Sequence, residues 1–255
     1  MTAHNLWFEK SWAVIDRPYS SSERNLLTPM MTPLQFVHAL QLTDSFFPVG
    51  AFAYSDGLET AAANGAVHDA ESLRIWMNHF LNNVFVPCDG LALLNCAEAF
   101  RRGDFQTIYA LDDELTAIKP ATAVRNASRS VGKRLFAAYS EISKDANFAK
   151  WVQTLPQCNA PVAYAVVMTH RGMNSREALL AFGYGRLTGI VSAGLRLIAI
   201  GQQQAQILLA ELLERLPDAV ERIVQIESEP LRSFAPMMDI AQMNHQYVYS
   251  RLFRS

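Results

Sequence analysis

Histidine, cysteine and carboxylate side chains are the groups in this sequence that could bind a metal ion or act as nucleophiles. The histidines show neither an HExxH motif nor i, i+4 pairing; they are His4, His38, His68, His79, His170 and His245. The three cysteines, Cys88, Cys96 and Cys158, form no CxxC pair and no disulfide framework. No metal site is therefore expected within this chain.

Phosphate-binding chemistry is not indicated either. The GxxxxGK[ST] motif is missing, and the nearest fragment, Val131–Arg134, has neither the upstream glycine nor a serine or threonine after its lysine. Gly183, Gly185 and Gly189 lack GxGxxG spacing, and no predicted strand precedes them. We interpret these glycines as positions where helices pack closely. No cofactor is expected to be bound by this chain.

The composition bears on the compartment and on the classes of partner. Only 18% of the 255 residues are charged and the net charge is −2, so there is no basic footprint for nucleic acid. The few cysteines favour a reducing compartment, the cytoplasm. The apolar stretch Leu179–Ile200 contains Arg186 and Arg196, which favours a buried helix over a membrane span.

The segment DSFFPVGAFAYSDGLET, residues 44–60, combines a turn with a helix start. Asp56 and Glu59 have the spacing of a capping box, which predicts that Asp56 caps a helix and Glu59 reaches back to its start. Pro48 and Gly50 predict a sharp turn. Helix initiation alone does not explain the aromatic residues around the turn, which are Phe46, Phe47, Phe52 and Tyr54.

The last eleven residues, HQYVYSRLFRS, contain aromatic residues and arginines but no acidic residue. Tyrosine and arginine dominate the energetic centres of protein interfaces, because they bury a large area and keep a polar group. Chain ends also fray. The composition leaves both interpretations open, a frayed end and a docking element.

Helical periodicity places these segments in an all-α protein. Thr32-Pro33 predicts a helix from Pro33 to Leu42. A second amphipathic helix is predicted over residues 70–86, with Asp69 as its cap and Pro87 as its stop, and a later one is predicted to end at Pro217. Strand patterns are almost absent. We predict one single-domain helical bundle of about eight to ten helices.

Two smaller expectations accompany this prediction. Asp112, Asp113 and Glu114 are interpreted as a solvated helix face. The chain is divided into a flexible N-terminal extension over residues 1–30, an all-α domain over 31–227 and a C-terminal tail over 228–255 that docks a partner.

Three ordered motifs resemble the UreF family of urease accessory proteins. They are PVGAF with YS and GLE in residues 48–59, SAGLRL at 192–197 followed by Gly201-Gln202, and YSRLFRS at 249–255. Arg125 with Gly132 and Arg134 resembles a basic helical segment of the family less closely. The chain departs from the family pattern at positions that bear on partner affinity: Ala160, Ala199, Gln246 and Tyr247.

The resemblance implies a homodimeric, non-enzymatic adaptor. It would link the accessory protein UreD (also called UreH) to the GTPase UreG, act on urease apoprotein subunits and assist Ni²⁺ insertion, with Ni²⁺ and GTP handled by the partners. Implied partner-binding residues are Pro48, Gly50, Phe52, Tyr54, Ser55, Gly57, Glu59, Gly201, Gln202, Tyr249, Ser250, Arg251, Leu252, Phe253 and Arg254.

Two other hypotheses stay open at this point. In one, the chain is an all-α enzyme whose polar residues, for example Glu59, His79, Cys88 and Arg125, converge only in three dimensions. In the other, the first motif only builds the core, and the partner interface lies elsewhere.

Overall fold

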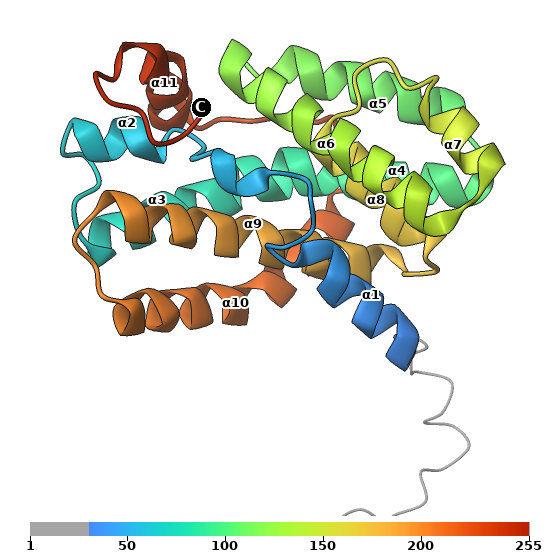
Figure 1. Cartoon of the computed structure of the whole chain (residues 1–255), viewed down its shortest axis with the longest axis horizontal. Coiled ribbons are helices and arrows are strands. Elements are labelled where there is room, and N and C mark those ends of the chain that lie inside the picture. The colour runs from blue at the N-terminus through green and yellow to red at the C-terminus, as the bar shows by residue number, and fades with distance from the viewer. Residues whose placement is uncertain (1–30, 255) are drawn as a thin grey trace, which may run out of the picture. The chain divides into compact units, whose positions relative to one another are not determined.

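The structure is a computed structural model that describes residues 31–254, and residues 33–254 belong to one compact unit. The predicted extension, residues 1–30, lies outside the described residues. The α-helices are α1 (Pro33–Thr43), α2 (Leu58–Ala63), α3 (Ala70–Phe80), α4 (Leu91–Arg102), α5 (Phe105–Ile118), α6 (Thr122–Ser143), α7 (Ala146–Val152), α8 (Ala160–His170), α9 (Ser175–Leu197), α10 (Gln202–Gln225) and α11 (Pro236–Asn244) (Figure 1). No strand occurs within residues 31–254, and the all-α prediction is confirmed.

Helix α8 forms the centre of the core. Every residue from Pro161 to Met168 is buried, so this helix is apolar on all sides and is enclosed by α4, α6 and α9. The other long helices bury one face each. On α10, for example, Leu208, Leu212 and Leu216 point inward. This arrangement holds α9 in the middle of the unit, where it contacts both α1 and α2 (Figure 1).

Local signals explain where several helices begin. Asp69 accepts a hydrogen bond from the backbone of Ser72 at 2.8 Å and caps α3, as predicted. Asn174 and Glu177 form a capping box at the start of α9. Helix α1 begins at Pro33, and it ends one residue beyond the predicted Leu42.

Two prolines do not end helices, and these predictions were wrong. Pro87 lies inside a π-helical segment, Leu81–Gly90, that joins α3 to α4 without a break. The wider π turn accommodates a residue that has no N–H to donate. Pro217 lies inside α10, where buried neighbours on both sides, Leu216 and Ala219, keep the helix packed in the core. Tertiary packing therefore outweighs the local cost of each proline.

Two helical stretches are long and apolar enough to cross a membrane by length and composition alone. These are Ala70–Arg102, in which 78% of the most apolar window is buried in the unit, and Ser175–Leu197, in which 50% is buried. Core helices pass the same test, and the first stretch is enclosed by its neighbours.

Asp113 and Glu114 on α5 are exposed, as expected of a solvated helix face, but Asp112 is not. Its side chain is fully buried and accepts hydrogen bonds from the backbone amides of Gln157, Cys158 and Asn159 at 2.9, 2.7 and 2.8 Å. One carboxylate thus satisfies three amides of the turn that starts α8. The same turn presses against α6, where a Cβ on Gly132 would overlap the carbonyl oxygen of Cys158.

We expect Gly132→Ala to destabilise the fold. The added methyl group meets backbone that cannot move aside cheaply, so the free energy of unfolding should fall by roughly 1–3 kcal/mol. Gly189→Ala in α9 is the matched control, because a Cβ there would meet nothing within 4 Å. Chemical denaturation of both variants measures the difference. Equal stabilities would contradict the close approach of α6 to the turn.

Candidate functional site

Glu59, in the first turn of α2, fixes the position of the C-terminal tail. Its side chain is 4% exposed and accepts hydrogen bonds from Nε2 of His245 at 2.7 Å and from the backbone amides of Leu252 and Phe253 at 2.5 and 3.3 Å. A buried carboxylate requires such donors, because its desolvation is otherwise costly. One side chain therefore binds two separate points of the last eleven residues.

Further contacts complete this arrangement. The backbone amide of Arg254 donates to the carbonyl of Ala53 at 2.7 Å. The guanidinium of Arg196, at the end of α9, lies 4.4 Å from the ring centroid of Phe253, and it donates to the carbonyl of Phe52 at 3.3 Å. We call Phe52, Ala53, Glu59 and Arg196 the tail cradle. It brings together residues from all three sequence motifs.

Gly57 lets α11 approach α2. Its φ is +85°, and a Cβ there would lie 2.9 Å from Cγ and 3.1 Å from the backbone nitrogen of Gln242 on α11. Helix α11 packs on α2, and its residues Met238 and Ala241 are buried. A side chain at Gly57 would therefore strain the backbone and push α11 away.

The predicted capping box at Asp56 was wrong. The residue before α2 is Gly57, which makes no side-chain cap, and Glu59 points to the tail instead of back to the helix start. Asp56 itself has a φ of +52° and forms an ion pair with Arg186 on α9 at 3.0 Å. The spacing of a capping box is thus present, but both carboxylates have partners that are distant in the sequence.

The tail and α11 also expose apolar side chains. Tyr249 is fully exposed and Leu252 is 70% exposed, although the backbone of Leu252 is held by Glu59. On α11, the exposed side chains follow helical spacing and lie on the side away from α2; they are Met237, Ile240 and Met243. We call Tyr249, Leu252 and these three α11 residues the tail surface.

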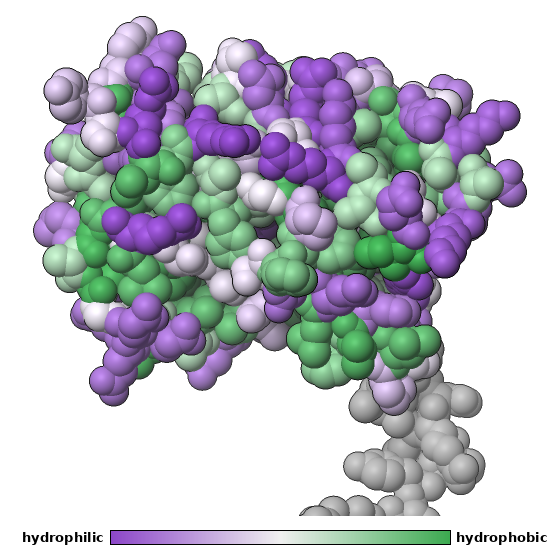
Figure 2. Space-filling view, viewed as in Figure 1, coloured by the Kyte–Doolittle hydropathy of each residue, from purple (hydrophilic) through white to green (hydrophobic). Residues whose placement is uncertain are grey.

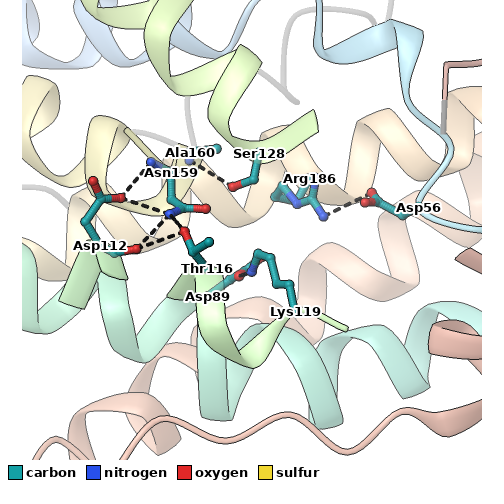
Figure 3. A network of polar contacts seen from close by, with 9 residues as sticks. All are labelled: Asp56, Asp89, Asp112, Thr116, Lys119, Ser128, Asn159, Ala160 and Arg186. Atoms are coloured by element: carbon teal, nitrogen blue, oxygen red, sulfur yellow. Dashed lines mark hydrogen bonds and ion pairs between the residues drawn. The ribbon is translucent and has the colours of Figure 1, made fainter. Parts of the chain in front are cut away.

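A cavity of about 120 Å³ has two ion pairs in its wall, and Figure 3 shows both pairs. Its wall carries the Asp56–Arg186 pair and a second ion pair, in which Lys119 donates to Asp89 at 2.6 Å. Burial alone would lower the pKa of Lys119, but the Asp89 carboxylate outweighs it and the pKa is raised. Both cations thus stay charged beside their carboxylates.

The residues of the enzyme alternative do not assemble into a site. Burial raises the pKa of the Cys88 thiol to about 12, which keeps it protonated and unreactive. His79 lies exposed on α3 and contacts Asn83. Arg125 donates to the carbonyls of Lys119 and Pro120, and Glu59 is occupied by the tail. Among residues 31–254, no group of three histidine, cysteine or carboxylate side chains could hold a metal ion.

The predicted partner-binding residues fall into two classes by their solvent exposure. Exposed positions are Pro48, Gly201, Gln202, Tyr249, Ser250, Arg251, Leu252 and Arg254. Buried or half-buried positions are Gly50, Phe52, Tyr54, Ser55, Gly57, Glu59 and Phe253. Gly201 and Gln202 start α10 and take no part in the tail cradle. Tyr54 lines the cavity.

The sequence did not indicate that Arg196 belongs to the tail cradle or that His245 is a partner of Glu59. Arg196 lies inside the motif SAGLRL, and His245 is the first residue of the tail. Nothing in their spacing relates them to Glu59, because the contact between His245 and Glu59 spans 186 residues of chain.

The comparisons with known proteins agree on one family. A family model described as UreF matches residues 67–213. The urease accessory protein UreF of Trichormus variabilis is 30% identical over 229 residues, which are 89% of this chain and 99% of that protein. The corresponding protein of Methylobacillus flagellatus is 31% identical over 86% of this chain and 97% of its own length. That of Microcystis aeruginosa is 31% identical over 89% of this chain and its whole length.

We expect Glu59→Gln to release the tail. Glutamine carries an NH₂ group where glutamate has its second carboxylate oxygen, so a donor would face the N–H groups of the tail. The backbone amides of Leu252 and Phe253 should therefore exchange with solvent at least about tenfold faster. The free energy of unfolding should fall by roughly 1–3 kcal/mol. Hydrogen exchange measures the first effect. The control is Glu71→Gln, whose carboxylate pairs with Arg74 on the surface of α3; unchanged protection in the Glu59 variant would contradict the cradle.

Proposed function

Because the chain belongs to the UreF family of urease accessory proteins, we propose that it is the adaptor of a nickel-delivery complex. In this role it links UreD (UreH) to the GTPase UreG and assists the insertion of Ni²⁺ into urease apoprotein. Ni²⁺ and GTP are handled by those partners in the cytoplasm. A member of this family is an accessory protein and not an enzyme.

The observation that carries the proposal is the fixed but outward-facing tail. Protein interfaces are dominated by a few aromatic, apolar and arginine side chains. The cradle holds the tail backbone at Leu252 and Phe253, and it leaves Tyr249 and the side chain of Leu252 free to contact a partner. A tail ordered before binding loses less conformational entropy when the partner arrives. We assign the tail surface to the accessory partner UreD (UreH).

We expect the double substitution Tyr249→Ala and Leu252→Ala to abolish capture of UreD (UreH). Both side chains are exposed, so the melting temperature should stay within about 2 °C of the parent value. These substitutions are cleaner than removal of the tail, because removal would also take away Phe253, which is 4% exposed. Co-expression, affinity purification and urease activation assays measure the outcome.

The control for this experiment is Ile207→Ala, which removes a 55% exposed apolar side chain from α10. Its capture of the partner should match the parent chain. Undiminished capture by the Tyr249/Leu252 variant would remove the tail surface from the proposal.

The proposed homodimer has support on another face of the unit. Helix α1 buries only Ala39 and Leu42, and it exposes an unusual number of apolar side chains, Leu34, Phe36, Val37 and Leu40. Figure 2 shows hydrophobic side chains gathered over this helix. Tyr184 and Leu180 are exposed on α9, along which α1 runs. Such a contiguous apolar surface is typical of a self-association site.

We expect the double substitution Val37→Glu and Leu40→Glu to produce a monomer. Two charges would have to be buried in the contact, which costs several kcal/mol. Light scattering after size exclusion should give one chain mass, 28.5 kDa, where the parent gives twice that value. Ile75→Glu, at a 49% exposed position of α3, should stay dimeric. A dimeric Val37/Leu40 variant would move the interface elsewhere.

A further inference from the structure

The middle of α6 carries cations that lack carboxylate partners. Between Glu114 and Glu141 the chain has no acidic residue, and five cations lie in that interval, Lys119, Arg125, Arg129, Lys133 and Arg134. Lys119 pairs with Asp89, and Arg125 is occupied by backbone carbonyls. The other three lie on the partly or fully exposed side of α6, away from its buried residues. We call Arg129, Lys133 and Arg134 the α6 basic surface.

Several arginines elsewhere in the unit, unlike these three cations, have carboxylate partners. Arg74, Arg101, Arg176 and Arg232 each form an ion pair with a nearby glutamate. Within residues 31–254, no carboxylate lies within ion-pair distance of any residue of the α6 basic surface. Figure 2 shows hydrophilic side chains along the upper part of this face, over α6. The positive charge there is therefore not neutralised internally.

The α6 basic surface adjoins the part of the first motif that the tail cradle does not use. A Cβ on Gly50 would overlap the guanidinium of Arg134, so Arg134 lies directly on the turn made by Pro48, Val49 and Gly50. Gly50 has a φ of +69°. At the start of the same turn, the ring of Phe46 is 94% exposed. This turn thus has an exposed aromatic residue at its start and contacts Arg134 at Gly50.

We infer that the α6 basic surface and Phe46 bind an acidic segment of a protein partner, at a site separate from the tail surface. Arginine and lysine without internal partners attract carboxylates across an interface and speed encounter. An exposed aromatic ring supplies the apolar contact that charge alone does not. Three cations on a chain of net charge −2 are too few to bind a nucleic acid backbone tightly. The inference rests on the proposed adaptor role, because that role requires a second partner surface.

The first test does not depend on the other accessory proteins. A fluorescein-labelled peptide of eight glutamates is titrated with the full chain at low salt, and an eight-nucleotide DNA strand is titrated in parallel. We expect the double substitution Lys133→Glu and Arg134→Glu to weaken peptide binding by about tenfold or more, with a reduced salt dependence. The control, Arg215→Glu with Arg222→Glu on α10, should change it by less than about twofold. Equal losses of peptide affinity in the two double variants would overturn the inference. So would tighter binding of the DNA strand than of the peptide by the parent chain.

The second test uses the full complex. The Lys133/Arg134 variant is co-expressed with urease and the other accessory proteins. It should fail to bind one partner, while the partner captured through Tyr249 and Leu252 stays bound. Phe46→Ala should weaken the binding of the same partner, although it changes no charge. If the parent chain captures no accessory protein, the adaptor role fails, and the peptide titration still decides the inference. Retention of every partner by both the charge-reversal and the Phe46 variants would refute it.

Discussion

The position of the chain's C-terminus depends on one buried carboxylate. Glu59 stands in a six-residue helix that is too short to be stable alone, so α2 needs tertiary contacts. The carboxylate accepts from His245 and from the amides of Leu252 and Phe253, and α11 packs on α2 beside it. Because a buried carboxylate without donors is costly, the helix, the tail and α11 are held in one arrangement or lost together.

The same principle recurs elsewhere in the unit. Asp112 satisfies three amides at the start of α8, Asp56 pairs with Arg186, and Asp89 pairs with Lys119 (Figure 3). Each of these contacts joins segments that packing of apolar side chains alone would leave free to slide. Apolar contacts set the compactness of the core, and the buried carboxylates select which helix ends and turns meet.

The sequence could predict the helical class and several helix starts, because those depend on periodicity and on caps within four residues. It could not predict that Pro87 and Pro217 lie inside helices, since the compensation comes from packing far along the chain. It identified Glu59 as important but gave it a local partner. Local spacing describes which hydrogen bonds are possible within a turn, whereas the cradle depends on donors 186 to 194 residues away.

An adaptor has to hold its partners at fixed relative positions, and the segment Phe46–Glu59 provides a physical means of doing so. One end of this segment is pressed under Arg134 of α6, and the other end holds the tail through Glu59. Between these ends, Asp56 is tied to Arg186 of α9, a core helix that cannot shift without disturbing α3 and α10. A short segment anchored at three points transmits little flexibility, so a partner on the α6 basic surface and one on the tail surface would be held in a defined geometry. This anchoring explains why proline, glycine, aromatic and acidic residues are concentrated in the short segment Phe46–Glu59.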